Sequence, residues 1–424
     1  MPTRTVSITG GNFNATSSWT GGVVPLTTDD IIADATSGPL TINVASTVTG
    51  FNFTNYTSTL TLTANFASQG NATMSFGSSM SIVGNGWIAS SSGTKNMRSN
   101  GLTIPKFGVA GNATVCTLLD NFTIDEFLVS PTNNQNAING FSIYTKKITG
   151  TGSIGGGFQS NSLIGTTALR FENPSGAIWD INYSSMEFQT PIYINLNGYM
   201  TFSANSYINI VSGYTFSLIS GTISGDPNLI MSSRSNSRLF YNLGSNTVWN
   251  RVFIAEVITG GTFSCELLDD LRFNYMATGV RASGNTNYWG PSGGSRASIR
   301  FYGNKRLIGG SVNMFPFSDL LGGVGATPKW DGQPFELWLP SGQTHSFTEL
   351  NTSGLPQNRG LIRAATASSP TYISVSGTQS VVYTTFRDVY SSNAIYTFGG
   401  STSNTQNIFV ANTMVPNSSS IFIE

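Results

Sequence analysis

The sequence predicts an all-β protein whose strands stack in repeats, and three observations lead to this class. Charged residues make up only 9% of the chain, so Ser, Thr, Asn and Gly must supply most of its polarity. These residues favour turns and solvated strand faces and are poor in helix interiors. Apolar and polar residues alternate in many short segments, which indicates strands with one buried face. A helical period sustained over three turns is hard to find.

The alternating segments recur along the whole chain. They include Ile42 with Val44, Phe51 with Phe53, Leu60 with Leu62, Ile192 with Ile194, and Ile208 with Ile210. Apolar clusters follow one another at a spacing of about twenty residues, which is typical of solenoids in which each unit buries its apolar face on the next. The sequence therefore predicts a right-handed parallel β-helix. The alternative is a row of tandem antiparallel β-sandwiches, with strands roughly every 8–12 residues.

An internal echo supports duplication of the repeat. The segments VCTLLDNFTI, from Val115, and SCELLDDLRF, from Ser264, share Cys-x-Leu-Leu-Asp followed by a strand. We expect Cys116 and Cys265 to face the core as small apolar residues without forming a disulfide. Because residues 284–296 are the most loop-like tract in the middle of the chain, we predict a β-helix body with an N-terminal cap over 1–290 and C-terminal β-rich repeats over 291–424.

Composition argues against several classes of protein. Twenty basic and twenty acidic residues give a net charge of zero, and the longest basic run is the pair Lys146-Lys147. Nucleic acid and anionic membranes are therefore not expected partners. No apolar run approaches the ~18 residues of a membrane helix. One histidine and two cysteines leave little for a metal site, and we predict neither a metal nor a cofactor.

The stretch GGNFNATSSWTGGVVPLTTDD, residues 10–30, is a turn-rich entry to the first strands. We expect Trp19 to close the apolar end of the first repeat, because a solenoid must hide its terminal core from water. Pro25 would prevent a further strand from pairing there. Asp29 and Asp30 would add charge at an exposed edge. An ordinary turn with a core tryptophan explains the same residues.

The same stretch resembles the start of a module in structural proteins of tailed bacteriophages, which are β-helical, and similar openings occur in bacterial surface β-helices. The matching residues are Gly11, Phe13, Trp19, Gly21, Gly22, Val24, Pro25, Asp29 and Asp30. A second match, FELWLPSGQTHSFTELNTSG with the strands after it, resembles the closing repeats of the phage module. The final residues depart from that pattern, because NTQNIFVANT replaces the expected Asn-Ser-Gly-Trp.

This resemblance implies a non-enzymatic virion structural protein: a capsid decoration, head-fibre or tail-fibre component. It would be a homotrimer that contacts other virion proteins and, as a further partner, host surface glycan. The N-terminal residues contain no apolar stretch typical of a secretory signal, so we expect assembly into the virion in the host cytoplasm. Two alternatives remain open, namely a tailspike-type polysaccharide depolymerase and a bacterial surface adhesin or S-layer-like module.

Candidate chemistry is sparse. A depolymerase would use two facing carboxylates, and the candidates are Asp120, Asp125, Glu126, Glu266, Asp269, Asp270 and Asp388. We assign none of them a catalytic role, because adjacent strand residues point to opposite faces. His345 has no second histidine to complete a triad or zinc site. Aromatic residues expected on or beside loops are better candidates for partner or glycan contacts, while packing under loops is the favoured interpretation of them. They are Tyr288, Trp289, Trp330, Trp338 and Tyr390.

Overall fold

The structure is a computed structural model of the 424-residue chain, and its described part is made of β-strands apart from one short 3-10 helix. The all-β prediction is therefore confirmed. The structure describes residues 2–110, 114–130, 136–150, 161–164, 168–173, 176–181, 186–211, 215–232, 239–244, 246–255, 262–278, 297–314, 335–354, 356 and 359–411.

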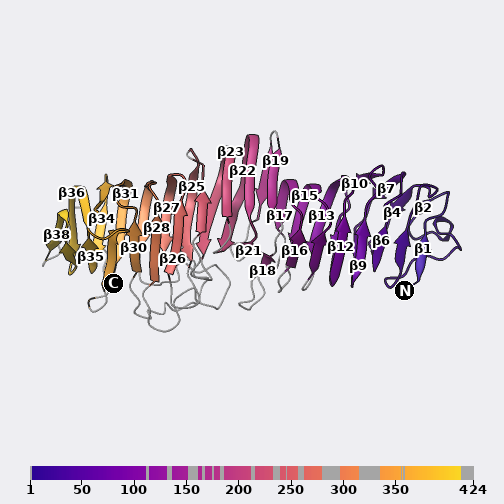
Figure 1. Ribbon diagram of the computed structural model, residues 1–424, viewed down its shortest axis with the longest axis horizontal. Helices are drawn as coiled ribbons and strands as arrows, with labels where there is room; N and C mark the ends of the chain where they lie inside the picture. The colour runs from indigo at the N-terminus through magenta and orange to yellow at the C-terminus, as the bar shows by residue number, and fades with distance from the viewer. Residues whose placement is uncertain are drawn as a thin grey trace. The chain divides into compact units, whose positions relative to one another are not determined.

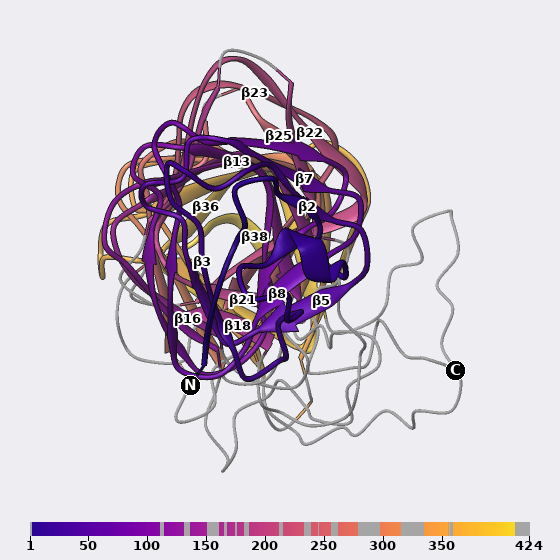
Figure 2. The ribbon, with the colours of Figure 1, turned by 90° about the vertical axis from the view of Figure 1, so that its right-hand side faces the viewer.

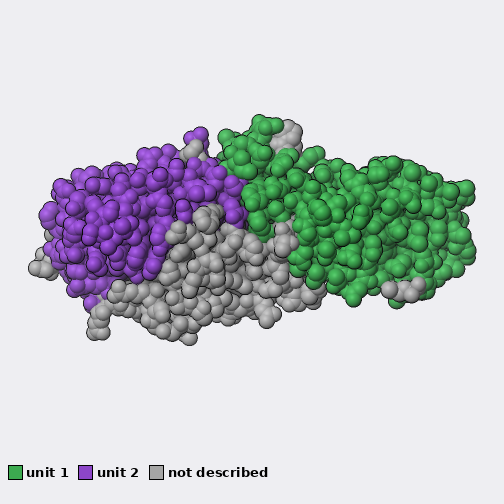
Figure 3. All heavy atoms as spheres, viewed as in Figure 1, with its two compact units in different colours: residues 1–206, 218–225 green, residues 207–217, 226–424 purple. Residues whose placement is uncertain are grey.

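The chain divides into two compact units, Met1–Ser206 with Leu218–Gly225, and Tyr207–Ser217 with Asp226–Glu424 (Figure 3). The predicted boundary near residue 290 lies in residues 279–296, outside the described residues, and stays a prediction.

The first unit contains most of the short strands. They are β1 (Thr3–Thr5), β2 (Gly11–Asn12), β3 (Asp30–Ile32), β4 (Leu40–Ile42), β5 (Ser46–Val48), β6 (Gly50–Asn52), β7 (Thr59–Leu62), β8 (Phe66–Ser68), β9 (Ala72–Ser75), β10 (Ser81–Gly84), β11 (Ile88–Ser90), β12 (Thr94–Arg98), β13 (Thr103–Ala110), β14 (Val115–Leu118), β15 (Phe122–Ser130), β16 (Asn136–Gly140), β17 (Ile143–Gly150), β18 (Asn161–Ile164), β19 (Leu169–Asn173), β20 (Ala177–Asp180) and β21 (Met186–Gln189), with the 3-10 helix η1 at Thr16–Ser18.

Two long strands contribute residues to both units, namely β22 (Ile192–Val211) and β23 (Thr215–Ser232). The second unit continues with β24 (Leu239–Asn242), β25 (Val248–Ala255), β26 (Thr262–Leu267), β27 (Leu271–Thr278), β28 (Ala297–Tyr302), β29 (Leu307–Met314), β30 (Phe335–Leu339), β31 (Thr344–Ser353), β32 (Gly360–Ala364), β33 (Thr371–Val375), β34 (Gln379–Val382), β35 (Thr384–Arg387), β36 (Val389–Phe398), β37 (Ser401–Ser403) and β38 (Gln406–Ala411).

Strand pairing is parallel throughout the described ladders. In the first unit β13 pairs with β15 and β15 with β17, so that Phe107 aligns with Phe127 and Phe127 with Ile148 (Figure 1). The isolated Val6–Trp19 bridge is antiparallel. Antiparallel β-sandwiches, the alternative fold, are therefore wrong for the described strands.

Register creates buried columns, because a residue at the inward position of one strand aligns with an inward residue of the next. In the first unit one column runs through Ile31, Phe51, Met74, Met97 and Leu118, and each of these side chains is buried. In the second unit an equivalent column runs through Ile299, Leu337, Ile362 and Phe386. Polar residues alternate with these positions and face outward, as the period of two predicts.

A separate four-stranded parallel sheet lies in the first unit, in the order β2-β4-β7-β10. Its inward residues Leu40, Leu60 and Ile82 align with one another and are buried. The last strand of this sheet ends at Gly84, whose φ of 101° lies in the left-handed region that favours glycine. A Cβ at Gly84 would collide with the Leu62 carbonyl oxygen on the preceding strand. Glycine is thus required where adjacent turns stack this closely.

The N-terminal stretch confirms one expectation and corrects another. Trp19 is buried, its Nε1 donates to the Phe13 carbonyl oxygen at 2.7 Å, and its ring meets the Phe13 ring edge-on at 5.3 Å. Asp29, however, does not add charge at an exposed edge. It is fully buried, accepts 2.9 and 3.1 Å hydrogen bonds from Arg4 Nε and the Leu26 amide, and so holds the turn before β3 in place.

Candidate functional site: an outward arginine–tryptophan column and a polar groove

An outward column of large polar side chains crosses four successive strands of the second unit. Arg300 in β28, Trp338 in β30, Arg363 in β32 and Arg387 in β35 align in register. The guanidinium carbons of Arg300 and Arg363 each lie 4.1 Å from the centre of the Trp338 ring. Because β28 and β32 flank β30 on opposite sides, the two guanidinium groups cover opposite faces of the indole, at about 0.5–1 kcal/mol per exposed cation–π contact.

Acidic side chains of the described residues lie beside this arginine–tryptophan column. Trp338 Nε1 donates to Glu336 Oε1 at 2.6 Å, and the Asp388 carboxylate lies 4.0 Å from Arg387 Nε. Arg363 and Arg387 are aligned neighbours, about 4.8 Å apart along the stack, and like charges placed opposite one another destabilise a sheet. Arg363 and Arg387 therefore place two positive charges side by side in a chain that contains few charges.

The structure describes two of the five aromatic residues that were predicted as partner or glycan contacts. Tyr288, Trp289 and Trp330 lie outside the described residues. Trp338 and Tyr390 lie within strands, β30 and β36, and not on loops. The Tyr390 ring meets the Tyr372 ring edge-on at 5.7 Å, and its hydroxyl donates to Asn404 Oδ1 at 3.4 Å. Since Tyr390 aligns with Tyr372 and Trp338 with Arg363, the two sequence-predicted residues belong to different columns.

Several candidate acids have partners. Three of them form ion pairs: Asp125 with Lys146 at 2.8 Å, Glu126 with Lys147 at 2.8 Å and Asp270 with Arg306 at 2.6 Å. The two Asp120 carboxylate oxygens accept hydrogen bonds from the Ser99 and Asn100 amides, both at 2.7 Å. Asp388 Oδ1 accepts a hydrogen bond from Asn404 Nδ2 at 2.6 Å. Burial raises the pKa of Asp270, but the hydrogen bonds and charge of Arg306 outweigh it and lower that pKa overall. Glu266 and Asp269 are half-buried.

His345 is fully buried at the start of β31. Its Nδ1 accepts the Leu307 amide at 3.0 Å, and its Nε2 donates to the Pro340 carbonyl oxygen at 3.3 Å. This pair of bonds fits the neutral ring. Burial lowers the pKa of His345 to about 4, against smaller opposing effects of Pro340 and Asp270. His345 therefore links the start of β29, the end of β30 and the start of β31, and its burial keeps it from exchanging protons with solvent.

The two cysteines behave as predicted. Cys116 and Cys265 are buried and free, and Cys116 Sγ lies 3.5 Å from Ser90 Oγ. One neighbour of Cys116 in register is Lys95, a buried lysine that no local pattern of the sequence indicates. Its Nζ donates to the Gly70 and Ser92 carbonyl oxygens, and burial lowers its pKa. These bonds compensate for burying the ammonium group, so Lys95 stabilises a corner of the fold.

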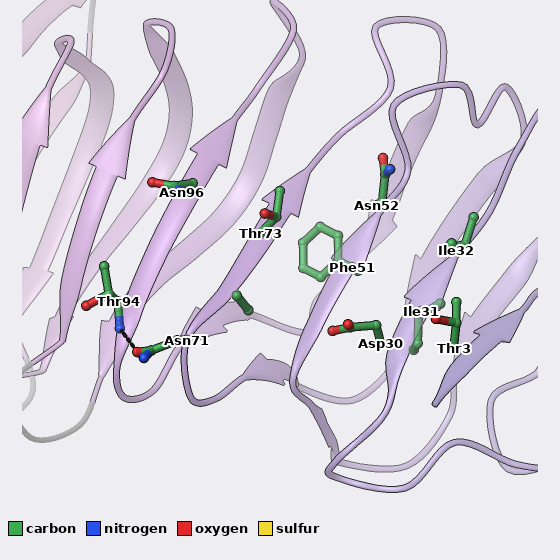
Figure 4. Close-up of a pocket in the computed structure, with 11 residues that line it drawn as sticks. Thr3, Asp30, Ile31, Ile32, Phe51, Asn52, Asn71, Thr73, Thr94 and Asn96 are labelled. Carbon is green, nitrogen blue, oxygen red and sulfur yellow. Dashed lines mark hydrogen bonds between the residues drawn. The ribbon is translucent and has the colours of Figure 1, made fainter. Parts of the chain in front are cut away.

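A groove of about 740 Å³ lies on the outer surface of the first unit, across β1, β3, β6, β9 and β12 (Figure 4). Asn and Thr side chains dominate its walls, Asp30 stands among them, and the lining contains no basic residue. No local sequence pattern predicts the groove, because its residues come from five repeats. The available signal was the run of Asn and Thr at outward positions, seen in Asn52, Thr73 and Asn96.

Comparisons with family models, curated proteins and solved structures find no match to this chain. The described residues contain no group of three or more His, Cys, Asp or Glu that could hold a metal ion. Nor is any helix in the described ranges long and apolar enough to cross a membrane.

Proposed function

We propose that this protein is a non-enzymatic structural component of a tailed-phage virion, built as a right-handed parallel β-helix. It acts as a capsid decoration, head-fibre or tail-fibre protein, assembles as a homotrimer and presents its outer surfaces and loops to other virion proteins. The proposal combines the resemblance of residues 10–30 and 335–397 to phage proteins with the arrangement of the strands.

The observation that carries the proposal is the sustained parallel register. Lys95 aligns with Cys116, and Cys116 with Ile138, at separations of 21 and 22 residues. In Figure 2, with the N-terminal strands facing the viewer, the chain of the first unit is drawn as successive turns around a common interior. Parallel register that continues from one turn to the next supports a β-helix, and a β-helix with a continuous core supports a mechanical role.

The state of the carboxylates favours a scaffold over a depolymerase. A glycosidase requires one carboxyl group that can donate a proton and a second that attacks or activates water. Asp125, Glu126 and Asp270 instead pair with basic side chains, and the pKa of Asp270 is lowered, which is the wrong direction for a general acid.

The arginine–tryptophan column is the proposed contact with another virion protein. Arginine and tryptophan are enriched among the residues that contribute most to protein interfaces. Since Arg300, Arg363 and Arg387 carry positive charge, the complementary surface is acidic. Both faces of Trp338 are already covered, so the indole acts by holding two guanidinium groups in place.

Sedimentation equilibrium of the whole recombinant chain tests the assembly. The proposal expects a particle with three times the mass of one chain. A monomer at micromolar concentration would overturn the trimeric part of the proposal, and release of reducing ends from host polysaccharide by the purified chain would overturn the non-enzymatic part.

Co-sedimentation with phage particles stripped of this protein tests the column. We expect Trp338→Ala to weaken binding by about tenfold, because it releases two arginines at a desolvated contact. The matched control is Trp87→Ala, since Trp87 is also half-buried beneath a cation, Lys106, but lies in the first unit. Equal weakening by both substitutions would contradict the assignment of the column.

A further inference from the structure

The groove of the first unit is lined by polar side chains that have no part in the proposed structural role. Figure 4 shows the side chains of Asp30, Asn52, Asn71, Thr73, Thr94 and Asn96 arranged around it. The groove crosses five strands, and four spacings of about 4.8 Å give it a length of about 19 Å. Its floor consists of the buried Ile31 and Phe51, part of the apolar core, so the groove rests on the rigid part of the repeat.

A glycine lets the strands beside the groove approach closely. Gly50 stands in β6 next to Asp30, its partner in register on β3. A Cβ at this position would lie 2.7 Å from the Thr73 carbonyl oxygen, 2.9 Å from Ala72 Cβ and 3.2 Å from Asp30 Oδ1. Any larger residue would therefore collide with the backbone of β9 and disturb the position of Asp30 and Thr73, two residues of the lining.

The lining offers hydrogen-bonding groups that the protein itself leaves available. The half-buried Asp30 carboxylate has no hydrogen bond or ion pair with the described residues. Asn52 Oδ1 accepts from Thr54, and Asn71 Oδ1 accepts from the Thr94 amide at 2.9 Å, so each amide oxygen is engaged and the NH₂ group of each side chain is left as a donor. The hydroxyls of Thr73 and Thr94 can donate or accept.

This set of groups selects the chemical class of the ligand. A carboxylate without a basic neighbour repels anions, which argues against nucleic acid and acidic polymers. Fixed amide donors, hydroxyls and one carboxylate acceptor match a molecule that presents donors and acceptors along its whole length. Ile32 and Ala72 add small apolar surfaces between the polar groups. Neutral saccharides have this mixture of hydroxyls and apolar C–H faces, and the length of the groove fits several linked sugars.

We propose that the groove formed by β1, β3, β6, β9 and β12 binds a neutral oligosaccharide, with Asp30 accepting hydrogen bonds from sugar hydroxyls and Asn52, Asn71 and Asn96 donating to sugar oxygens. The site deepens the proposed function by giving the virion protein a place for a glycan of the host surface. The choice of a neutral saccharide as ligand, however, depends only on the residues that line the groove.

The test is binding of the full chain to an array of neutral and acidic oligosaccharides, followed by calorimetric titration with the tightest neutral binder. We expect binding to neutral glycans and not to uronate- or phosphate-bearing ones. Asp30→Asn should weaken binding by about tenfold or more, since a hydrogen bond to a charged group is lost. Asn71→Ala should weaken it by about fivefold through loss of a neutral one.

The matched control is Asn65→Ala. Asn65 Oδ1 accepts the Trp87 amide at 3.1 Å, as Asn71 accepts the Thr94 amide, but Asn65 does not line the groove. Both alanine variants should lose similar stability, and only Asn71→Ala should lose affinity. Binding confined to acidic glycans or nucleic acid, no binding on the array, or equal loss in both variants would overturn the proposal. Since co-sedimentation with stripped phage particles tests the virion role separately, the virion role and the groove can fail independently.

Discussion

Protonation of the single histidine gives the sharpest prediction. Neutral His345 joins the Leu307 amide to the Pro340 carbonyl oxygen inside the protein, and its pKa is about 4 against an ordinary value of 6.5. Below pH 6.5 the unfolded chain binds a proton that the folded chain excludes, so stability is complete above pH 6.5 and declines as the pH falls toward 4. Between pH 7.5 and pH 4.5 the expected loss is about 2.5 kcal/mol.

Two measurements check this prediction. The chain has one histidine, so ¹³C-labelled histidine gives one imidazole signal in NMR. In the folded protein that signal should stay constant from pH 8 to pH 5, whereas in urea it should titrate near 6.5. Urea unfolding at pH 7.5 and pH 4.5 should show the corresponding fall in the free energy of unfolding.

His345→Gln supplies the control for unfolding, because glutamine keeps a donor and an acceptor but does not titrate in this range. The variant should be less stable at pH 7.5 and should lose little more at pH 4.5. Titration of the folded wild-type signal near 6.5, or an unchanged pH dependence in the variant, would refute the reasoning.

Three further predictions concern the packing of the repeats. Gly140→Ala should destabilise the protein by about 1–3 kcal/mol, measured by urea unfolding, because Gly140 has a φ of 97° and a Cβ there would collide with the Leu118 carbonyl oxygen. Phe51→Ala should cost about 3–5 kcal/mol in the same assay, because it empties a buried column position. Cys116 and Cys265 should not react with Ellman's reagent until the chain unfolds, because both are buried and burial raises the pKa of Cys116 to about 11; rapid reaction in buffer would contradict this burial.

The strands could be predicted from sequence alone because the alternation that indicates them involves only neighbouring residues. The alternation of Phe51 and Leu62 with polar neighbours requires only a period of two, and both residues are buried as it predicts. The spacing of the apolar clusters predicted stacking, and the parallel register of the described strands agrees with it. The echo around Cys116 and Cys265 likewise identified two buried positions.

What sequence could not predict depends on contacts between repeats. Asp29 follows a loop and was expected at an exposed edge, but Arg4, which lies 25 residues earlier, pairs with it in the interior. The indole of Trp338 is covered by arginines from the strands on either side, which no local pattern indicates. The groove likewise brings together side chains of five strands, which no local pattern indicates.

Immunogold labelling of purified tailed-phage particles that carry this gene, with an antibody raised against the recombinant chain, tests the proposed place of the protein in the virion. We expect gold at one fixed position on intact particles, on the capsid or on the tail. Particles without label, together with label on the surface of the uninfected host, would contradict a virion structural protein and favour a bacterial surface module.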